Sequence, residues 1–194
     1  KRKSHRTSRM KIIKRIADNV VLFAGSDLTL NDSGVHGPGW SFGKINPAIL
    51  SIEDVDSVPE YFIGGGWTYN NGEWASNSTG NNYMLPQKKA AKIAELEAAR
   101  LALEYSNITH DSKIWEASGD RRALLAQVLS VNSVPESMYW RDAAGTEHAM
   151  TFAQLEALGR AILERGLTAD ANLKTKRAAV EAAGTVEDVD AVVW

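Results

Sequence analysis

The stretch from Trp67 to Tyr105 decides the fold, because a strand pattern gives way to a helix pattern within it. It reads WTYNNGEW over residues 67–74, ASNSTGNNYML over 75–85 and PQKKAAKIAELEAARLALEY over 86–105. The dipeptide Asn71-Gly72 favours the left-handed dihedrals of a tight hairpin turn between two aromatic strands. In the last segment, alanine, leucine and isoleucine recur at the 3.6-residue spacing of a helix. The sequence therefore predicts an α+β chain that changes class near residue 86.

The helical part of this stretch predicts an amphipathic linking helix over residues 86–106, with Pro86 in its first turn. Residues 76–85 are polar and predict a linker before it. One face of the helix carries Ala90, Ile93, Ala94, Glu97, Ala98, Leu101 and Tyr105. Such a face serves either as a coiled-coil contact between copies of the chain or as a packing face within one domain. We name these seven residues as a candidate oligomer face and leave both interpretations open.

Residues 10–75, on the other side of the turn, predict a small antiparallel β module. Short apolar and aromatic runs, including residues 61–63, alternate there with Gly, Pro and Asn, which is the pattern of strands joined by turns. Four aromatic residues are candidates for binding a partner: Trp40, Trp67, Tyr69 and Trp74. Exposed aromatic rings are favoured at interfaces, but a module of this size also needs large side chains to build a core.

Residues 107–194 predict a compact C-terminal α+β unit of two β-hairpins and three to four helices. The hairpins are expected near residues 108–116 and 138–150, and a short helix over 120–131. Thr151 with Gln154 predicts a capping box that starts the next helix. Gly166 is expected to end that helix, with a further helix over 168–183. The apolar end of the chain, including Trp194, is expected to pack on the core.

Composition excludes several classes of protein. The chain of 194 residues contains no cysteine, so disulfides, thiol catalysis and cysteine-based zinc sites are absent. No apolar run approaches the ~20 residues of a membrane helix, and we expect no membrane insertion. Residues 1–9 hold five Lys or Arg, and the other 185 hold 17 basic and 24 acidic residues. An acidic body disfavours binding to nucleic acid. The first nine residues are either a basic arm or a non-native extension before Met10.

Motifs that would indicate catalysis or cofactor binding are incomplete. The four histidines (His5, His36, His110 and His148) stand in unrelated segments, and none has an i, i+4 partner for a metal site. Asp27–Asp32 lacks the glycine and glutamate of a calcium loop. Gly64–Gly66 precedes a predicted strand and not a helix that could hold phosphate. We therefore expect no catalytic residue, no metal and no cofactor, and hence not an enzyme.

The C-terminal half resembles a domain of unknown function that recurs at the C-terminal end of phage tail-fibre and neighbouring tail proteins. The resemblance covers roughly residues 88–194. It is carried by Trp140-Arg141-Asp142 with its Gly-containing turn, by the helix with Leu155 and Leu158, and by the segment from Leu173 to Thr-Val-Glu-Asp-Val (residues 185–189). Trp115 departs from the family pattern, which often has a polar residue or Phe there. The β module is similar, less closely, to small modules of fibre and fibre-assembly proteins.

The resemblance implies a non-catalytic structural component of a bacteriophage tail: a tail fibre, a baseplate protein or a fibre connector. It implies attachment to other tail proteins, multiple copies, and a place in the virion tail after assembly in the host bacterial cytoplasm. The alternative is a tail-fibre assembly chaperone. A second alternative is a module that binds or degrades host-surface polymers.

Overall fold

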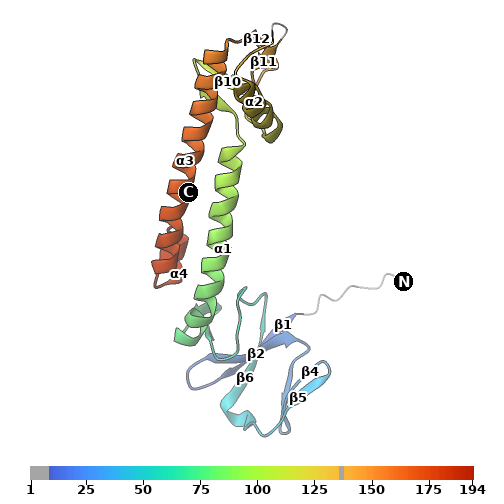
Figure 1. Ribbon diagram of the computed structural model, residues 1–194. Coiled ribbons are helices and arrows are strands. Elements are labelled where there is room, and N and C mark those ends of the chain that lie inside the picture. Colours follow the sequence, from blue (N-terminus) through green and yellow to red (C-terminus); the bar gives the residue numbers. More distant parts are fainter. Residues whose placement is uncertain (1–8, 136–137) are drawn as a thin grey trace, which may run out of the picture. The chain divides into compact units, whose positions relative to one another are not determined.

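The computed structural model describes residues 9–135 and 138–194 (Figure 1). It has small antiparallel sheets and α-helices, which confirms the predicted α+β class. The chain divides into two compact units. The first contains the residues up to 88 together with 184–186, and the second contains 89–183 and 187–194.

The first unit is built on a five-stranded antiparallel sheet with the strand order β6-β1-β2-β7-β8. Its strands are β1 (Met10–Arg15), β2 (Val20–Ser26), β6 (Leu50–Val55), β7 (Trp67–Asn70) and β8 (Glu73–Ser76). A three-stranded sheet contains β3 (Thr29–Asn31), β4 (Gly34–Gly37) and β5 (Trp40–Phe42). A short 3-10 helix, η1 (Pro47–Ile49), precedes β6.

The five-stranded sheet is covered on both faces. Neighbouring residues of a strand point to opposite faces, and the adjacent Ile12 and Ile13 are both fully buried, each in a different cluster. Lys14 is also buried, and its ammonium binds the Glu53 carboxylate at 2.6 Å and the Tyr69 carbonyl at 3.0 Å. These contacts compensate the buried charge, and they explain why β1 tolerates a lysine in its middle.

The hairpin predicted at Asn71-Gly72 is confirmed. Asn71 has a φ of 51° and Gly72 a φ of 90°, and the turn joins β7 to β8 in register. The strand predicted over residues 61–63 is wrong, because the chain turns there. The Phe62 N–H donates to the Pro59 carbonyl at 3.1 Å, and Phe62 packs on the core as part of that turn.

The helix α1 (Ser78–Glu104) is longer than predicted, so the expected linker over residues 76–85 is wrong from Ser78 onward. The Asn77 side chain caps the helix by accepting the N–H groups of Thr79 and Gly80 at 2.9 and 3.2 Å. Gly80 is needed because its backbone lies against Gly66, where a Cβ atom would come 2.1 Å from the carbonyl oxygen. Pro86 therefore lies inside the helix and not in its first turn.

The second unit confirms the two predicted hairpins. These are β9 (Ile108–His110) with β10 (Lys113–Trp115), and β11 (Tyr139–Arg141) with β12 (Glu147–Ala149). The chain's other helices are α2 (Gly119–Val131), α3 (Phe152–Ala182) and α4 (Val186–Asp190). The capping box of α3 forms as expected. Thr151 Oγ1 accepts the Gln154 N–H, and the Gln154 side chain accepts the Thr151 N–H.

The hairpins, α2 and the first half of α3 share one core. It contains Ile108, Trp115, Ala117, Leu125, Val128, Trp140, Leu155, Leu158 and Ile162. The predicted stop at Gly166 is wrong, because α3 continues through it as one helix of 31 residues. A helix-ending glycine adopts a positive φ, and Gly166 does not. Trp194 is 36% exposed and is not among the residues of this core, so its predicted packing stays a prediction.

Candidate interaction surfaces

Three of the four predicted partner-binding aromatics form a cluster on the first unit's sheet. The Trp74 ring lies 4.9 Å from Tyr69 and 6.3 Å from Trp67 between centroids, and it also meets Phe62 edge-on. All three predicted residues are half-buried, and Tyr69 and Trp74 pack against the cluster of Ile12, Val21 and Val55. The structure therefore places them mainly in the core of the unit.

Trp40 is separate from these three and more exposed. It stacks on Phe23 at 5.8 Å, and Phe42 packs on the same ring of Phe23 at 5.7 Å. Trp40 is 43% exposed and Phe42 is 56% exposed. The prediction missed Phe42 as a site residue. The alternation of strand β5, which puts residues 40 and 42 on one face, is the signal that could have found it.

The predicted oligomer face of α1 lies away from the helix's own packing. Leu96 is buried, whereas Ala90, Ala94, Ala98, Leu101 and Tyr105 are exposed on the opposite side. Leu101 and Tyr105 expose 45% and 49% of their surface. Two predicted members differ, since Ile93 is half-buried and Glu97 pairs with Arg177 of α3 at 3.0 Å. Five of the seven predicted residues therefore form an exposed stripe, with the other two at its border, and the role of this face as an oligomer contact stays a prediction.

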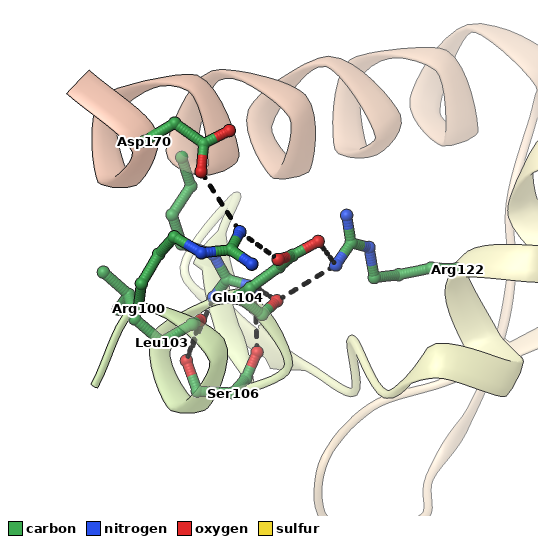
Figure 2. A network of polar contacts seen from close by, with 7 residues as sticks. Arg100, Leu103, Glu104, Ser106, Arg122 and Asp170 are labelled. Carbon is green, nitrogen blue, oxygen red and sulfur yellow. Dashed lines mark hydrogen bonds and ion pairs between the residues drawn. The ribbon is translucent and has the colours of Figure 1, made fainter. Parts of the chain in front are cut away.

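A polar network holds the end of α1 in the second unit (Figure 2). Glu104 lies between two guanidinium groups and accepts from Arg100 at 2.6 Å and from Arg122 of α2 at 2.8 Å. Arg100 also reaches Asp170 of α3 at 3.1 Å. Hydrogen bonding to Arg122, followed by the charges of the two arginines, lowers the pKa of Glu104 below its ordinary value. Glu104 is therefore an anchored carboxylate and not a proton donor.

Arg165 of α3 completes this joint by binding carbonyl groups at the end of α1 and just beyond it. Its guanidinium donates to the carbonyls of Glu104 at 2.9 Å, Ser106 at 3.0 Å and Asn107 at 3.0 Å. The end of a helix leaves such carbonyls without partners, so a positive group there satisfies them and suits the helix dipole. Burial lowers the pKa of Arg165, but an arginine stays charged.

The other titratable cluster lies at the hairpins of the second unit. His148 Nε2 contacts Asp142 at 2.9 Å, and its Nδ1 contacts the Lys113 ammonium at 3.3 Å. The hydrogen bond from His148 and the turn N–H groups of Thr146 and Ala144 lower the pKa of Asp142. Both ring nitrogens of His148 are engaged and its ring meets Trp115 edge-on, so it is held as a structural residue.

Within residues 9–135 and 138–194, no three His, Asp or Glu side chains gather as a metal site would require. In the same residues no helix combines the length and apolar character needed to cross a membrane. A groove of about 430 Å³ in the second unit is lined by α2 and the segment before β11, with Leu124, Val131 and Tyr139 at its surface. Among the lining residues that the structure describes, Arg121 carries the charge.

Comparison with known families matches the second unit. A family model described as a domain of unknown function (DUF4376) covers residues 87–193, more than half of the chain. No curated protein and no solved structure shows significant similarity to the chain. The match begins two residues before the second unit does, so the family and the compact unit have nearly the same boundary.

Proposed function

The chain belongs to the DUF4376 family, and we propose that it is a non-catalytic structural component of a bacteriophage tail. The family's description assigns no function. The tail context is supported by the resemblance of residues 88–194 to a domain found near the C-terminal end of tail-fibre proteins. We place the protein in a fibre, the baseplate or a connector between them, after assembly in the host's cytoplasm.

The observation that carries this proposal is the outward stripe of α1. Ala90, Ala94, Ala98, Leu101 and Tyr105 form an apolar line, and none of them is buried by the second unit. Large apolar side chains exposed in a contiguous line mark surfaces that meet other proteins. A protein that attaches to tail proteins and to copies of itself uses such a surface. Such a surface binds other proteins and does not catalyse a reaction.

The test is the presence of the chain in washed phage particles, measured by quantitative mass spectrometry. We expect it there in a fixed ratio to the tail proteins. A phage carrying Leu101→Glu is expected to incorporate at least about tenfold less of the chain, because the charge would be desolvated in a contact. The control is Ile114→Glu, at a residue that is 55% exposed on β10 and outside the stripe.

Absence of the wild-type chain from washed particles would overturn the structural role. If the tail fibre then needed co-expression of this chain to form soluble trimers, the protein would be an assembly chaperone. Release of sugars from host polysaccharide by the purified chain would instead identify a polymer-degrading module.

A further inference from the structure

The second unit contains two antiparallel helices whose relative level is set by three contacts. Arg100 of α1 binds Asp170 of α3 at 3.1 Å, and Glu97 binds Arg177 at 3.0 Å. The Lys89 ammonium donates to the carbonyl of Glu181 at 2.8 Å. Because the helices are antiparallel, a residue one position nearer the C-terminal end of α1 lies level with a residue one position nearer the N-terminal end of α3. Each position shifts the level by about 1.5 Å.

Both helices carry an exposed stripe on the side turned away from their packing. The α1 stripe is Ala90, Ala94, Ala98, Leu101 and Tyr105, and the α3 stripe is Leu163, Leu167, Ala171, Lys174 and Ala178. The two stripes have the same spacing of four, four, three and four residues. All ten residues are exposed, and Leu163 and Leu167 expose 61% of their surface each. The buried residues of α3, such as Ile162 and Ala169, lie on its opposite side.

The two stripes match in side-chain size at the end of the helix pair where α1 ends. Leu163 and Leu167 lie near that level, because Arg165 between them binds the carbonyls of Glu104 and Ser106. Tyr105 and Leu101 lie at the same end, and toward the other end the α1 stripe continues as alanines and the α3 stripe as Ala171, Lys174 and Ala178. Two helices placed side by side at equal level would therefore set the large apolar residues beside one another, with Lys174 level with the alanines of α1.

The stripes also match in charge. In the part of the chain that the structure describes, Lys174 has no ion pair or hydrogen bond, and it lines a hollow of about 430 Å³ on α3. On α1, at nearly the same level, the Glu95 side chain is 63% exposed and pairs only with Lys92 on its own helix. A free cation on one stripe thus stands at the level of an exposed carboxylate beside the other.

We propose that the α1 stripe of one copy docks on the α3 stripe of a second copy, and that repetition of this contact closes a ring of identical chains. Because the stripes lie on opposite sides of the helix pair, the contact is heterologous, and such contacts form rings when the rotation closes. Pairing α1 with α1 would leave Leu163 and Leu167 uncovered. The inference rests on the proposed function, whose assembly it specifies.

A ring also suits the size of the surface. A standard interface buries ~800 Å² per partner, and three alanines, one leucine and one tyrosine offer less than that. Each copy in a ring makes two such contacts, one through each stripe, so the contacts reinforce one another. A free dimer would make one.

The first measurement is the mass of the full purified chain by light scattering during size-exclusion chromatography. We expect a whole multiple of the chain's mass, three or more. Leu101→Glu damages only the α1 stripe, and Leu167→Glu only the α3 stripe. Each is expected to lower self-association at least about tenfold and to give monomers, while Ile114→Glu keeps the wild-type mass. Circular dichroism establishes that each variant is folded, which its exposed position favours.

The mixing of the two variants decides between a heterologous and a two-fold contact. Each variant keeps one intact stripe of opposite kind, so an equimolar mixture at high concentration is expected to form a weak 1:1 dimer through a single contact and nothing larger. Dimers of Leu167→Glu alone would show that α1 pairs with α1 and would overturn the inference. A mixture that associates no more than either variant alone at the highest concentration, or a wild-type chain that is monomeric at all concentrations, would overturn it as well.

The charge pair supplies an independent test. Lys174→Glu is expected to weaken association several-fold, and Glu95→Lys added to it is expected to restore it, because opposite charges again face each other. No restoration would show that Lys174 and Glu95 do not meet. These measurements use the isolated chain, so a monomer found in washed phage particles would refute the ring and leave the tail function standing.

Discussion

Glu104 lies where polar contacts from three helices of the second unit meet. Its carboxylate joins Arg100 of α1 to Arg122 of α2 (Figure 2). Its backbone carbonyl accepts from Arg165 of α3. The side chain is only 18% exposed, so solvent screens these contacts less than those at the open surface. The side chain and the backbone carbonyl of this one residue thus link three helices.

The stability of the second unit is expected to depend on pH through Glu104. Its pKa is lowered in the folded chain relative to an ordinary value of 4.5, so its contribution is present above that value. The contribution is lost as the pH falls through the folded pKa. We expect Glu104→Gln to lower the free energy of unfolding by about 1–2 kcal/mol at neutral pH, measured by urea denaturation.

The matched control for this change is Glu156→Gln, at a residue 54% exposed and paired loosely with Arg160 at 3.6 Å. It is expected to change stability by less than about 0.5 kcal/mol. The difference between the two variants in the free energy of unfolding should shrink when the pH falls below the folded pKa of Glu104. A difference that stays constant down to acid unfolding would show that the charge of Glu104 is not what stabilises the joint.

Two glycines of helix α3, Gly159 and Gly166, have different roles in its packing. A Cβ atom added at Gly166 would have no atom within 4 Å of it, whereas a Cβ at Gly159 would meet Leu129 Cδ1 at 2.9 Å and Leu125 Cδ2 at 3.6 Å. Gly159 is therefore the contact point at which α2 approaches α3. Gly166 contributes only its backbone.

Alanine substitution is expected to separate these two roles. Gly166→Ala should raise the free energy of unfolding by about 0.5–1 kcal/mol, because alanine favours the helix. Gly159→Ala should be less stable than Gly166→Ala by about 1 kcal/mol or more, because Leu129 must move. Thermal unfolding followed by circular dichroism measures both. Equal gains at the two positions would contradict the close packing of α2 on α3.

The whole molecule contains separate cores for its two units. The cores of the first unit contain residues such as Ile13 and Val21, and the core of the second contains Trp140 and Leu158. α1 belongs to both units because it runs from Ser78 to Glu104, across the boundary at residue 88. Cores that do not share side chains can lose stability one at a time.

Leu158→Ala is expected to destabilise the second unit by about 2–5 kcal/mol, because it removes a fully buried side chain. Hydrogen exchange measured by mass spectrometry should show faster exchange in α2 and α3 and unchanged exchange in β1 and β2. Ile13→Ala, at an equally buried residue, should give the reverse pattern. Equal acceleration in both units by either variant would show that the chain unfolds as one.

The elements that the sequence predicted correctly depend on interactions between neighbouring residues. Asn71-Gly72 and the Thr151–Gln154 capping box were identified because each acts through a few neighbouring residues. The residues of the α1 stripe were grouped on one helix face because their spacing belongs to the helix itself, and the family resemblance was placed on nearly the residues that the DUF4376 family matches. The α+β class followed from the change of period near residue 86.

The tertiary structure alone decided the features that depend on distant neighbours. The residues from Ser78 to Pro86 look like a linker in the sequence, but they form the first turns of α1. Gly80 lies there against the backbone of Gly66, a contact that no local pattern reveals. The exposure of Leu163 and Leu167 depends on which side of α3 packs against the rest of the unit. Gly166 lies inside α3 because the packing around it does not end the helix there. Periodicity along a helix shows that a face exists, but only packing between helices determines which face is left for a partner.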